Sequence, residues 1–190
     1  MSDDLAALRL ALAAHACADE QERLDCHRIL AFVERHDQPF DRGIAEGHLT
    51  GSALLVSPDG ASVLLLRHRK LQRWLQPGGH ADPGERSGER VALREALEET
   101  GLEGLELHPT APRPLDVDVH DIPARPGEAA HEHLDLRYLV LAPGDAAHER
   151  NLDETDDLRW FGWHELPDDL DAGLRRALAK ARAWLPVEEA

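Results

Sequence analysis

The chain has 190 residues and a formal net charge of −16, because 37 acidic residues outnumber 21 Lys and Arg. Such a charge argues against a non-specific nucleic-acid binder, which needs a basic face, and it repels an anionic substrate unless cations are recruited locally. Hydrophobic residues make up 42% of the chain and aromatic residues only 4%, so a core can form but must rest on Leu, Val and Ala.

Residues 1–40 are predicted to form an N-terminal extension of two helices. Ser2 can cap the first helix, and Asp19 can cap the second. Apolar side chains follow at the spacing of one helix face, namely Leu5, Leu8 and Leu12 in the first helix and Cys26, Ile29, Leu30 and Val33 in the second. We expect this extension to pack against the rest of the chain or to form the contact of a homodimer.

The sequence predicts a cytoplasmic protein with reduced thiols and no membrane partner. The acidic N-terminus lacks the basic n-region of a secretory signal, and no apolar run approaches the roughly 18 residues that a membrane-spanning helix needs. The two cysteines, Cys17 and Cys26, do not form a C-x-x-C pair, so thiol chemistry is not expected.

A β-hairpin and a helix are predicted in the middle of the chain. Two apolar runs, residues 50–56 and 61–67, flank a Pro-Asp-Gly turn and predict the hairpin. The stretch L-Q-P-G-G-H at 75–80 is predicted to be a loop. Residues 88–100 are predicted to be helical, with Gly101 ending the helix.

The remaining pattern predicts three more strands and a last helix. The strands are expected at 114–119, 134–142 and 158–161, with a loop at 121–130, and the helix at about 169–185. Strands alternating with helices indicate an α/β (α+β) fold, with helices packed on a mixed sheet. We expect a single domain over residues 1–190.

Three glutamates crowd one side of the helix predicted at 88–100. Glu98 and Glu99 follow Glu95 at the spacings i+3 and i+4, where like charges cost a few tenths of a kcal/mol per exposed pair. A solvated charged face is the common explanation of such a run. The context favours a divalent-cation site, because a Gly-Gly loop precedes the helix and Gly101 directly follows it. Carboxylates that repel one another become favourable when a divalent cation lies between them, and their hard oxygen atoms suit Mg²⁺ or Mn²⁺.

These residues resemble the signature of the Nudix hydrolases, G-x5-E-x7-R-E-U-x-E-E-x-G-U, in which U is a bulky aliphatic residue. Gly79 and Glu85 match its start, and the run R-E-A-L-E-E-T-G-L at 94–102 matches its end. The likeness covers roughly residues 48–166, including L-R-W-F-G-W-H-E-L at 158–166. It implies an α/β/α sandwich with a mixed β-sheet, with the N-terminal helices outside the common core.

The chain departs from the signature at two places. Eight residues instead of seven separate Glu85 from Arg94, and the extra residue, such as Arg86, fits in the loop before a helix capped by Ser87. Such an insertion leaves the spacing within the helix intact, and it affects only the role expected for Glu85. Ala96 is small for a U position, which weakens a core contact but touches no ligand.

The resemblance implies a pyrophosphohydrolase that cleaves a nucleoside diphosphate linked to another moiety, with water attacking phosphorus and Mg²⁺ or Mn²⁺ as cofactor. The implied metal ligands are Glu95, Glu98, Glu99, Glu85 and the carbonyl of Gly79. Glu98, Glu95 and Arg94 are the implied catalytic residues, and Arg94 is expected to pair with Glu85. Glu98 is the first choice for the general base, and Glu132 and Glu154 are alternatives.

Candidate substrate-binding residues lie outside the signature helix. The cationic stretch R-H-R-K-L-Q-R at 67–73 can receive phosphates or can simply be a solvated strand edge. The candidates are Arg67, Arg69, Arg73, His80, His133 and Glu154. Zinc is a weak alternative for the histidines, because His131 and His133 alone do not supply the three or four ligands that zinc needs.

Two other functions are compatible with the same family resemblance. A non-catalytic Nudix-like domain that binds a nucleotide for regulation would usually lose glutamates of the signature, and this chain keeps all three. An enzyme similar to isopentenyl-diphosphate isomerase would need an active-site cysteine near the sheet, whereas both cysteines fall in the N-terminal extension. The substrate itself is open among nucleotide sugars, dinucleoside polyphosphates, ADP-ribose, oxidised nucleotides and capped RNA ends.

Overall fold

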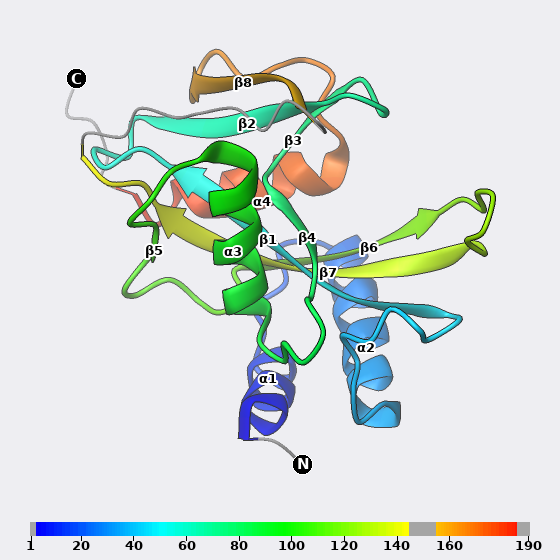
Figure 1. Cartoon of the computed structure of the whole chain (residues 1–190). Coiled ribbons are helices and arrows are strands. Elements are labelled where there is room, and N and C mark those ends of the chain that lie inside the picture. Colours follow the sequence, from blue (N-terminus) through cyan, green and yellow to red (C-terminus); the bar gives the residue numbers. More distant parts are fainter. Residues whose placement is uncertain (1–2, 145–154, 186–190) are drawn as a thin grey trace.

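The computed structural model describes residues 3–144 and 155–185, which form one mixed sheet with helices on both of its faces (Figure 1). The helices are α1 Asp3–Ala13, α2 Glu20–Arg35, α3 Gly88–Thr100 and α4 Ala172–Arg182. The strands are β1 Gly47–Val56, β2 Ser62–His68, β3 Arg73–Leu75, β4 Gly78–His80, β5 Glu106–Leu107, β6 Asp116–Ile122, β7 His131–Leu141 and β8 Thr155–Gly162. The expected α/β (α+β) class is therefore confirmed.

The sheet is centred on β1 and β7, which are parallel from Gly47 opposite Glu132 to Val56 opposite Leu141. The strand order is β3-β2-β1-β7-β5, with β4 paired to β1, β6 to β7 and β8 to β2. The β1–β2 hairpin is confirmed, since Leu55 lies opposite Leu64 in an antiparallel pair.

The prediction of a loop throughout residues 75–80 is wrong, because Gly78–His80 forms β4, antiparallel to β1. Two glycines are poor strand formers, but here they allow a close approach. A Cβ atom at position 78 would lie 2.3 Å from the Oγ of Ser52. The loop predicted at 121–130 is also too long, since β6 continues to Ile122 and β7 begins at His131.

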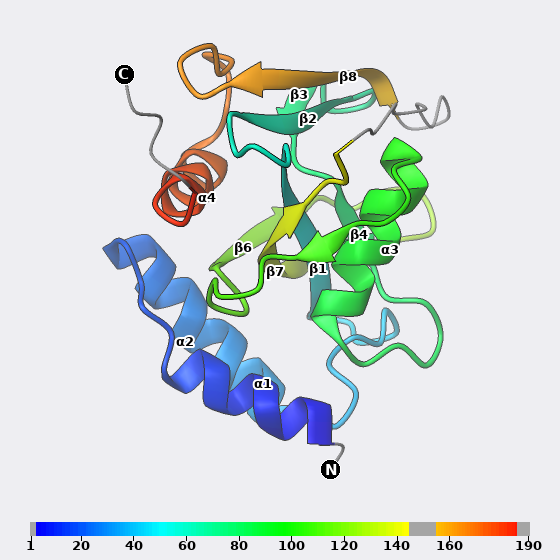
Figure 2. The same ribbon diagram turned by 90° about the vertical axis from the view of Figure 1, so that its left-hand side faces the viewer.

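Two hydrophobic layers cover the faces of the sheet, with α3 on one face and α4 on the other (Figure 2). Along β1, successive side chains point to opposite faces. Leu49, Ala53 and Leu55 join the α3 layer, whereas Leu54 and Val56 join the α4 layer. Ala96 of α3 is fully buried, and its small side chain belongs to the α3 layer.

The N-terminal helices pack against the sheet, because α1 contacts α2 and α2 contacts β6, and both helices lie together at one end of the sheet (Figure 2). Asp19 caps α2 by accepting a hydrogen bond from the backbone N–H of Glu22, as predicted. The buried Glu22 carboxylate also bonds to His15 and to Lys180 of α4, which ties the extension to the last helix. The predicted cap at Ser2 lies outside the described residues.

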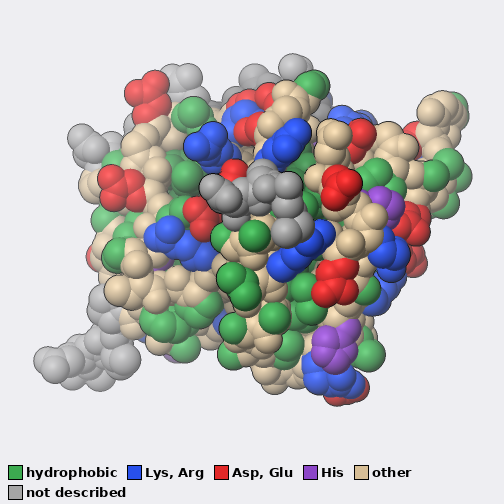
Figure 3. All heavy atoms as spheres, turned by 90° about the horizontal axis from the view of Figure 1, so that it is seen from below, with side chains coloured by type: hydrophobic (Ala, Val, Ile, Leu, Met, Phe, Trp, Pro, Cys, Tyr) green, Lys and Arg blue, Asp and Glu red, His purple; other side chains and the backbone are tan. Residues whose placement is uncertain are grey.

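The acidic composition does not produce one continuous acidic patch on the face seen in Figure 3, where acidic and basic side chains are interspersed. Cys26 is buried in α2, and Cys17 lies between α1 and α2. Within residues 3–144 and 155–185, no helix has the length and apolar character that crossing a membrane requires.

Candidate active site

The helix α3 carries the three glutamates and is fixed at its C-terminal end by glycine. Gly101 has φ 69, in the left-handed region that glycine adopts without strain, and its N–H donates to the Leu97 carbonyl at 2.8 Å. Ser87 does precede the helix, but its side chain makes no capping hydrogen bond, so the predicted cap is wrong in that respect.

The carboxylates of Glu95 and Glu99 lie against the backbone of β4. Glu99 accepts a hydrogen bond from the Gly78 N–H at 2.9 Å. Glu95 lies against Gly79, where an added Cβ atom would lie 2.6 Å from the Glu95 carboxyl carbon. The Gly-Gly sequence therefore lets two side chains of α3 reach a strand that a larger residue would hold away.

A single guanidinium, that of Arg94, joins the cluster. It donates to Glu85 at 3.0 Å, to Glu95 at 3.2 Å and to Glu98 at 3.1 Å. It also donates to the carbonyl of His80 at 2.5 Å. The expected pairing of Arg94 with Glu85 is present in the structure, so the extra residue in the preceding loop does not prevent it.

Exposure divides the three helix glutamates. The side chain of Glu98 is 52% exposed, that of Glu95 only 16%, and residue Glu99 is buried. Burial raises the pKa of Glu95 above its ordinary value, because the charged form is desolvated. Burial also acts to raise the pKa of Glu85, but the hydrogen bonds from Arg94 and from the backbone of Asp82, together with the nearby arginine charges, outweigh burial and lower that pKa.

The donor set of this cluster fits a hard dication. Glu85, Glu95, Glu98 and Glu99 offer only carboxylate oxygens, and the backbone of Gly79 adjoins Glu95. Among residues 3–144 and 155–185, Arg94 is the cation that pairs with Glu85, Glu95 and Glu98, so the negative charges of these three carboxylates exceed the positive charge. A divalent cation can offset that excess.

A pocket of about 410 Å³ opens beside the signature loop. Its walls come from residues 37–42, from residues 81–86 and from Leu5 of α1. Glu85 lies in the wall, so the pocket connects the N-terminal extension with the loop that precedes α3.

The predicted phosphate-binding arginines lie on β2, in the turn after it and on β3. The guanidinium of Arg67 lies over the Trp74 ring, 5.9 Å from its centroid. Arg69 donates to Asp156 at 2.9 Å, and Arg73 lies opposite His68 in the β2–β3 pair. These contacts explain the side chains structurally and leave their role toward a substrate a prediction.

The two alternative bases have different outcomes. Glu132 of β7 accepts a hydrogen bond from Arg28 of α2 and lines a groove with that helix. It is therefore held by the N-terminal extension. Glu154, which was also predicted to bind substrate, lies outside the described residues.

His80 and His133 come together, with their Nε2 atoms 3.1 Å apart. The third histidine of this cluster, His48 of β1, was not among the residues that the sequence predicted. Burial lowers the pKa of His48 and His80 to about 4 and that of His133 to about 2, and repulsion from neighbouring histidines when these are protonated and, for His48 and His80, from Arg42 adds to the effect. All three rings are therefore neutral near pH 7.

A signal for the missed residue exists in the alternation of polar residues along two strands. His48, Thr50 and Ser52 alternate along β1, and His131, His133, Asp135 and Arg137 alternate along β7. Thr50 and Ser52 donate to the buried Asp135 at 2.8 Å, which shows that these residues share one face.

Known proteins share the architecture and the sequence signature. The family model described as the NUDIX domain matches residues 48–190. The "Putative 8-oxo-dGTP diphosphatase" of Bacillus subtilis (strain 168) is 43% identical over 51 residues, which are 27% of this chain and 34% of that protein. The chain thus matches about a third of the length of that relative.

Solved structures agree on the fold. An Ap4A hydrolase from C. elegans aligns with TM-score 0.56 at 20% identity, covering 72% of this chain and 96% of that one. A MutT NUDIX hydrolase from Burkholderia pseudomallei aligns with TM-score 0.52 at 26% identity, covering 71% and 98% respectively. With the match over residues 48–190, these likenesses show that the chain belongs to the NUDIX family.

Proposed function

We propose that the chain is a metal-dependent pyrophosphohydrolase that cleaves a nucleoside diphosphate linked to another moiety. The observation that carries this proposal is the convergence of Glu95, Glu98 and Glu99 with Arg94 at the Gly78–Gly79 backbone. Similarity to proteins named for 8-oxo-dGTP and Ap4A supports a substrate of this class.

Mg²⁺ or Mn²⁺ would be held by Glu95, Glu98 and Glu99, with Glu85 and the Gly79 carbonyl as further ligands. When bound, such an ion polarises phosphoryl oxygens and lowers the pKa of water, so that a nucleophile is available near neutral pH. It would also admit an anionic diphosphate to a chain whose net charge is −16.

Glu98 is proposed as the general base. Its side chain is the most exposed of the three helix glutamates, so water can reach it, and Arg94 fixes its orientation through a 3.1 Å hydrogen bond. A base in this position takes the proton of the attacking water as the oxygen bonds to phosphorus. Glu132 is a weaker candidate because it is held by Arg28.

Arg94 and Glu85 are proposed to hold the site together. Arg94 contacts both the α3 carboxylates and the carbonyl of His80, so it fixes β4 relative to α3. Glu85 completes this link from the loop. The extra residue before α3 therefore does not prevent this pairing.

Contacts with the rest of the substrate stay predictions. Arg67, Arg69 and Arg73 are the proposed phosphate contacts, and the pocket beside Glu85 is a proposed place for the second moiety. His80 and His133 were predicted to touch substrate, and their contact with His48 supports the different role proposed below. A cytoplasmic location, a homodimer and a single domain over residues 1–190 likewise stay predictions.

A substrate panel tests the proposal directly. ADP-ribose, Ap4A, 8-oxo-dGTP, a nucleotide sugar and capped RNA would be incubated with Mg²⁺ and with Mn²⁺, and the phosphorylated products, such as AMP and ribose 5-phosphate from ADP-ribose or pyrophosphate from 8-oxo-dGTP, would be separated and measured. We expect cleavage of at least one compound, lost in chelator and reduced on the order of 10²–10⁴-fold in Glu98→Gln. Glu103→Gln, which changes an exposed glutamate just after α3, is the matched control and should keep the wild-type rate.

Either of two results would overturn the assignment. One is a folded protein that cleaves no diphosphate compound in either metal. The other is cleavage that Glu98→Gln leaves at the rate of Glu103→Gln.

A further inference from the structure

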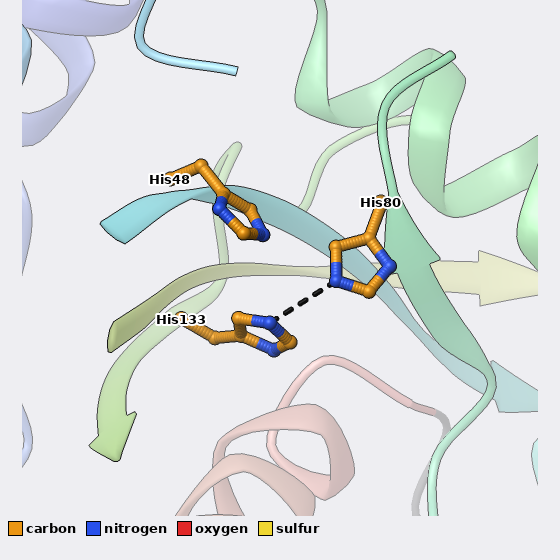
Figure 4. Close-up of side chains that lie close together, drawn as sticks. All are labelled: His48, His80 and His133. Carbon is orange, nitrogen blue, oxygen red and sulfur yellow. Dashed lines mark hydrogen bonds between the residues drawn. The ribbon is translucent and has the colours of Figure 1, made fainter. Parts of the chain in front are cut away.

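Three histidines from three different strands point their rings into one space (Figure 4). His48 belongs to β1, His80 to β4 and His133 to β7. Their ring centroids are 4.7–5.1 Å apart, and one nitrogen of each ring lies within 4.8 Å of the others. The sheet register explains the convergence, because His48 lies opposite His133 and His80 opposite Thr50.

The buried ring of His48 has no hydrogen-bond partner in the part of the chain that the structure describes. The residue is 2% exposed, and neither Nδ1 nor Nε2 is paired. A buried polar atom without a partner costs free energy, so such an atom calls for an explanation. The neighbouring side chains of Thr50 and Ser52 do bond to Asp135. Of these three polar side chains of β1, that of His48 is therefore the one without a hydrogen-bond partner among the described residues.

The spacing of the other two rings fits a shared metal ion. The Nε2 atoms of His80 and His133 are 3.1 Å apart. Two nitrogen ligands of a tetrahedral Zn²⁺, each about 2.05 Å from the ion, lie about 3.3 Å apart. Rotation of the His48 ring can bring a third nitrogen to the same centre, because it starts within 4.8 Å of the other two.

A fourth histidine lies next to this group. The ring of His131 stacks on that of His48, with centroids 5.1 Å apart. Its Nδ1 lies 2.9 Å from the Ala129 carbonyl, which favours a proton on that nitrogen and leaves Nε2 with a lone pair. The Nε2 atom is buried without a hydrogen-bond partner among the described residues.

We propose that His48, His80 and His133 bind a divalent transition-metal ion of the Zn²⁺ class, at a site separate from the carboxylate cluster of α3. Imidazole nitrogens suit such ions, whereas Mg²⁺ prefers oxygen. Three histidines leave a fourth position open for His131 or water. The proposal is independent of the proposed hydrolysis, because none of the signature glutamates belongs to the site.

The strand β4 separates the two sites. Position 79 faces Glu95, and the next side chain, His80, points to the opposite face, toward His48 and His133. The carbonyl of His80 meanwhile accepts a hydrogen bond from Arg94. An ion on the histidines therefore fastens β4 to β1 and β7 from the side away from α3.

Titration with Co²⁺ tests this site, using the full chain after removal of metals with a chelator. Four-coordinate Co²⁺ bound by nitrogen absorbs visible light strongly, whereas six-coordinate Co²⁺ on carboxylates absorbs weakly. We expect strong absorption that saturates at one ion per chain, that is competed by Zn²⁺ and that persists in millimolar Mg²⁺. Anomalous diffraction from a Zn²⁺-soaked crystal should give a peak between the three rings.

Matched variants separate the histidines from the glutamates. His48→Gln and His133→Gln should each weaken Co²⁺ binding at least tenfold, whereas Glu98→Gln and the exposed His164→Gln should leave it unchanged. Circular dichroism would check that each variant is folded, and His80→Asn is used if one of them is not. Absence of the strong absorption in the folded wild type, its loss in Mg²⁺, or its persistence in the histidine variants would overturn the proposal.

Discussion

The two sides of β4 offer different kinds of potential metal-binding atoms at neighbouring residues. On the α3 side, Gly79 faces the carboxylate of Glu95, and the donors are oxygens arranged around Arg94. On the other side, His80 faces His48 and His133, and the donors are nitrogens. A three-residue strand thus separates a site suited to hard ions from one suited to transition metals.

The largest effect should come from replacing Glu95, a proposed metal ligand on the α3 side. Glu95→Gln keeps the size of the side chain but removes the negative charge beside Gly79. We expect the rate of diphosphate hydrolysis to fall about 10³-fold, or about 4 kcal/mol in the barrier. Steady-state rates at several Mg²⁺ concentrations measure this.

The comparison between the two sides of β4 would fail if Glu95→Gln changed metal binding by the histidines instead of hydrolysis. Co²⁺ binding by the histidines serves as the control and should not change in this variant. A loss of Co²⁺ binding with normal hydrolysis would reverse the two assignments.

Stability on the other side of the sheet should depend on Asp118. This carboxylate bonds to His120 and lies 3.1 Å from the Arg137 guanidinium. Burial acts to raise its pKa, but the bond to His120 and the charge of Arg137 hold the pKa well below its usual range. Because the pair is largely buried, Asp118→Asn should lower the free energy of unfolding by about 3 kcal/mol at pH 7.

Acid titration gives the sign of the same effect. A carboxyl with a depressed pKa in the folded state stabilises the fold above its unfolded pKa of about 4, and that contribution is lost as the pH falls. Urea unfolding of the wild type should therefore show stability falling below about pH 5, and Asp118→Asn should show a smaller fall. Equal slopes in the two proteins would contradict the assignment.

Gly79→Ala should have an intermediate effect. The added Cβ atom would lie 2.6 Å from the Glu95 carboxyl carbon, so either β4 or the side chain must move. We expect hydrolysis to fall roughly tenfold and the free energy of unfolding to fall by about 1–3 kcal/mol. Gly144→Ala, where an added Cβ atom would meet nothing within 4 Å and the backbone has no positive φ, is the control.

The smallest effect concerns Glu95 in the metal-free protein. Its pKa is raised by burial, so its contribution to stability is present at low pH and is lost as the pH rises through the raised pKa. The stability of the wild type relative to Glu95→Gln should therefore increase as the pH falls, opposite in sign to Asp118. Denaturation curves of the wild type and of Glu95→Gln, each measured at pH 4 and at pH 7, would show this change in relative stability.

The contrast between the two sides also explains what the sequence could predict. Glu95, Glu98 and Glu99 lie within two turns of one helix, so helical spacing alone brings them together. The hairpin, α3 and the capping role of Asp19 were predictable for the same local reason. The Arg94–Glu85 pair was expected from the family resemblance.

The histidine cluster could not be predicted in this way. Its members are supplied by β1, β4 and β7, and only the parallel β1–β7 register brings His48 opposite His133. The strand β4 was itself missed, because two glycines and a proline resemble a loop until pairing with Ser52 and Gly51 is known. Long-range pairing of this kind leaves no periodic signal in a short window.

The position of a hard ion in the crystal is the most direct test of the central claim, that the carboxylates of α3 form the site of metal-dependent hydrolysis. An anomalous difference map from a Mn²⁺-soaked crystal should contain a peak on the α3 side of β4, in contact with Glu95 and Glu99. A map with no Mn²⁺ there, from a preparation that hydrolyses a diphosphate substrate with Mn²⁺, would contradict the claim.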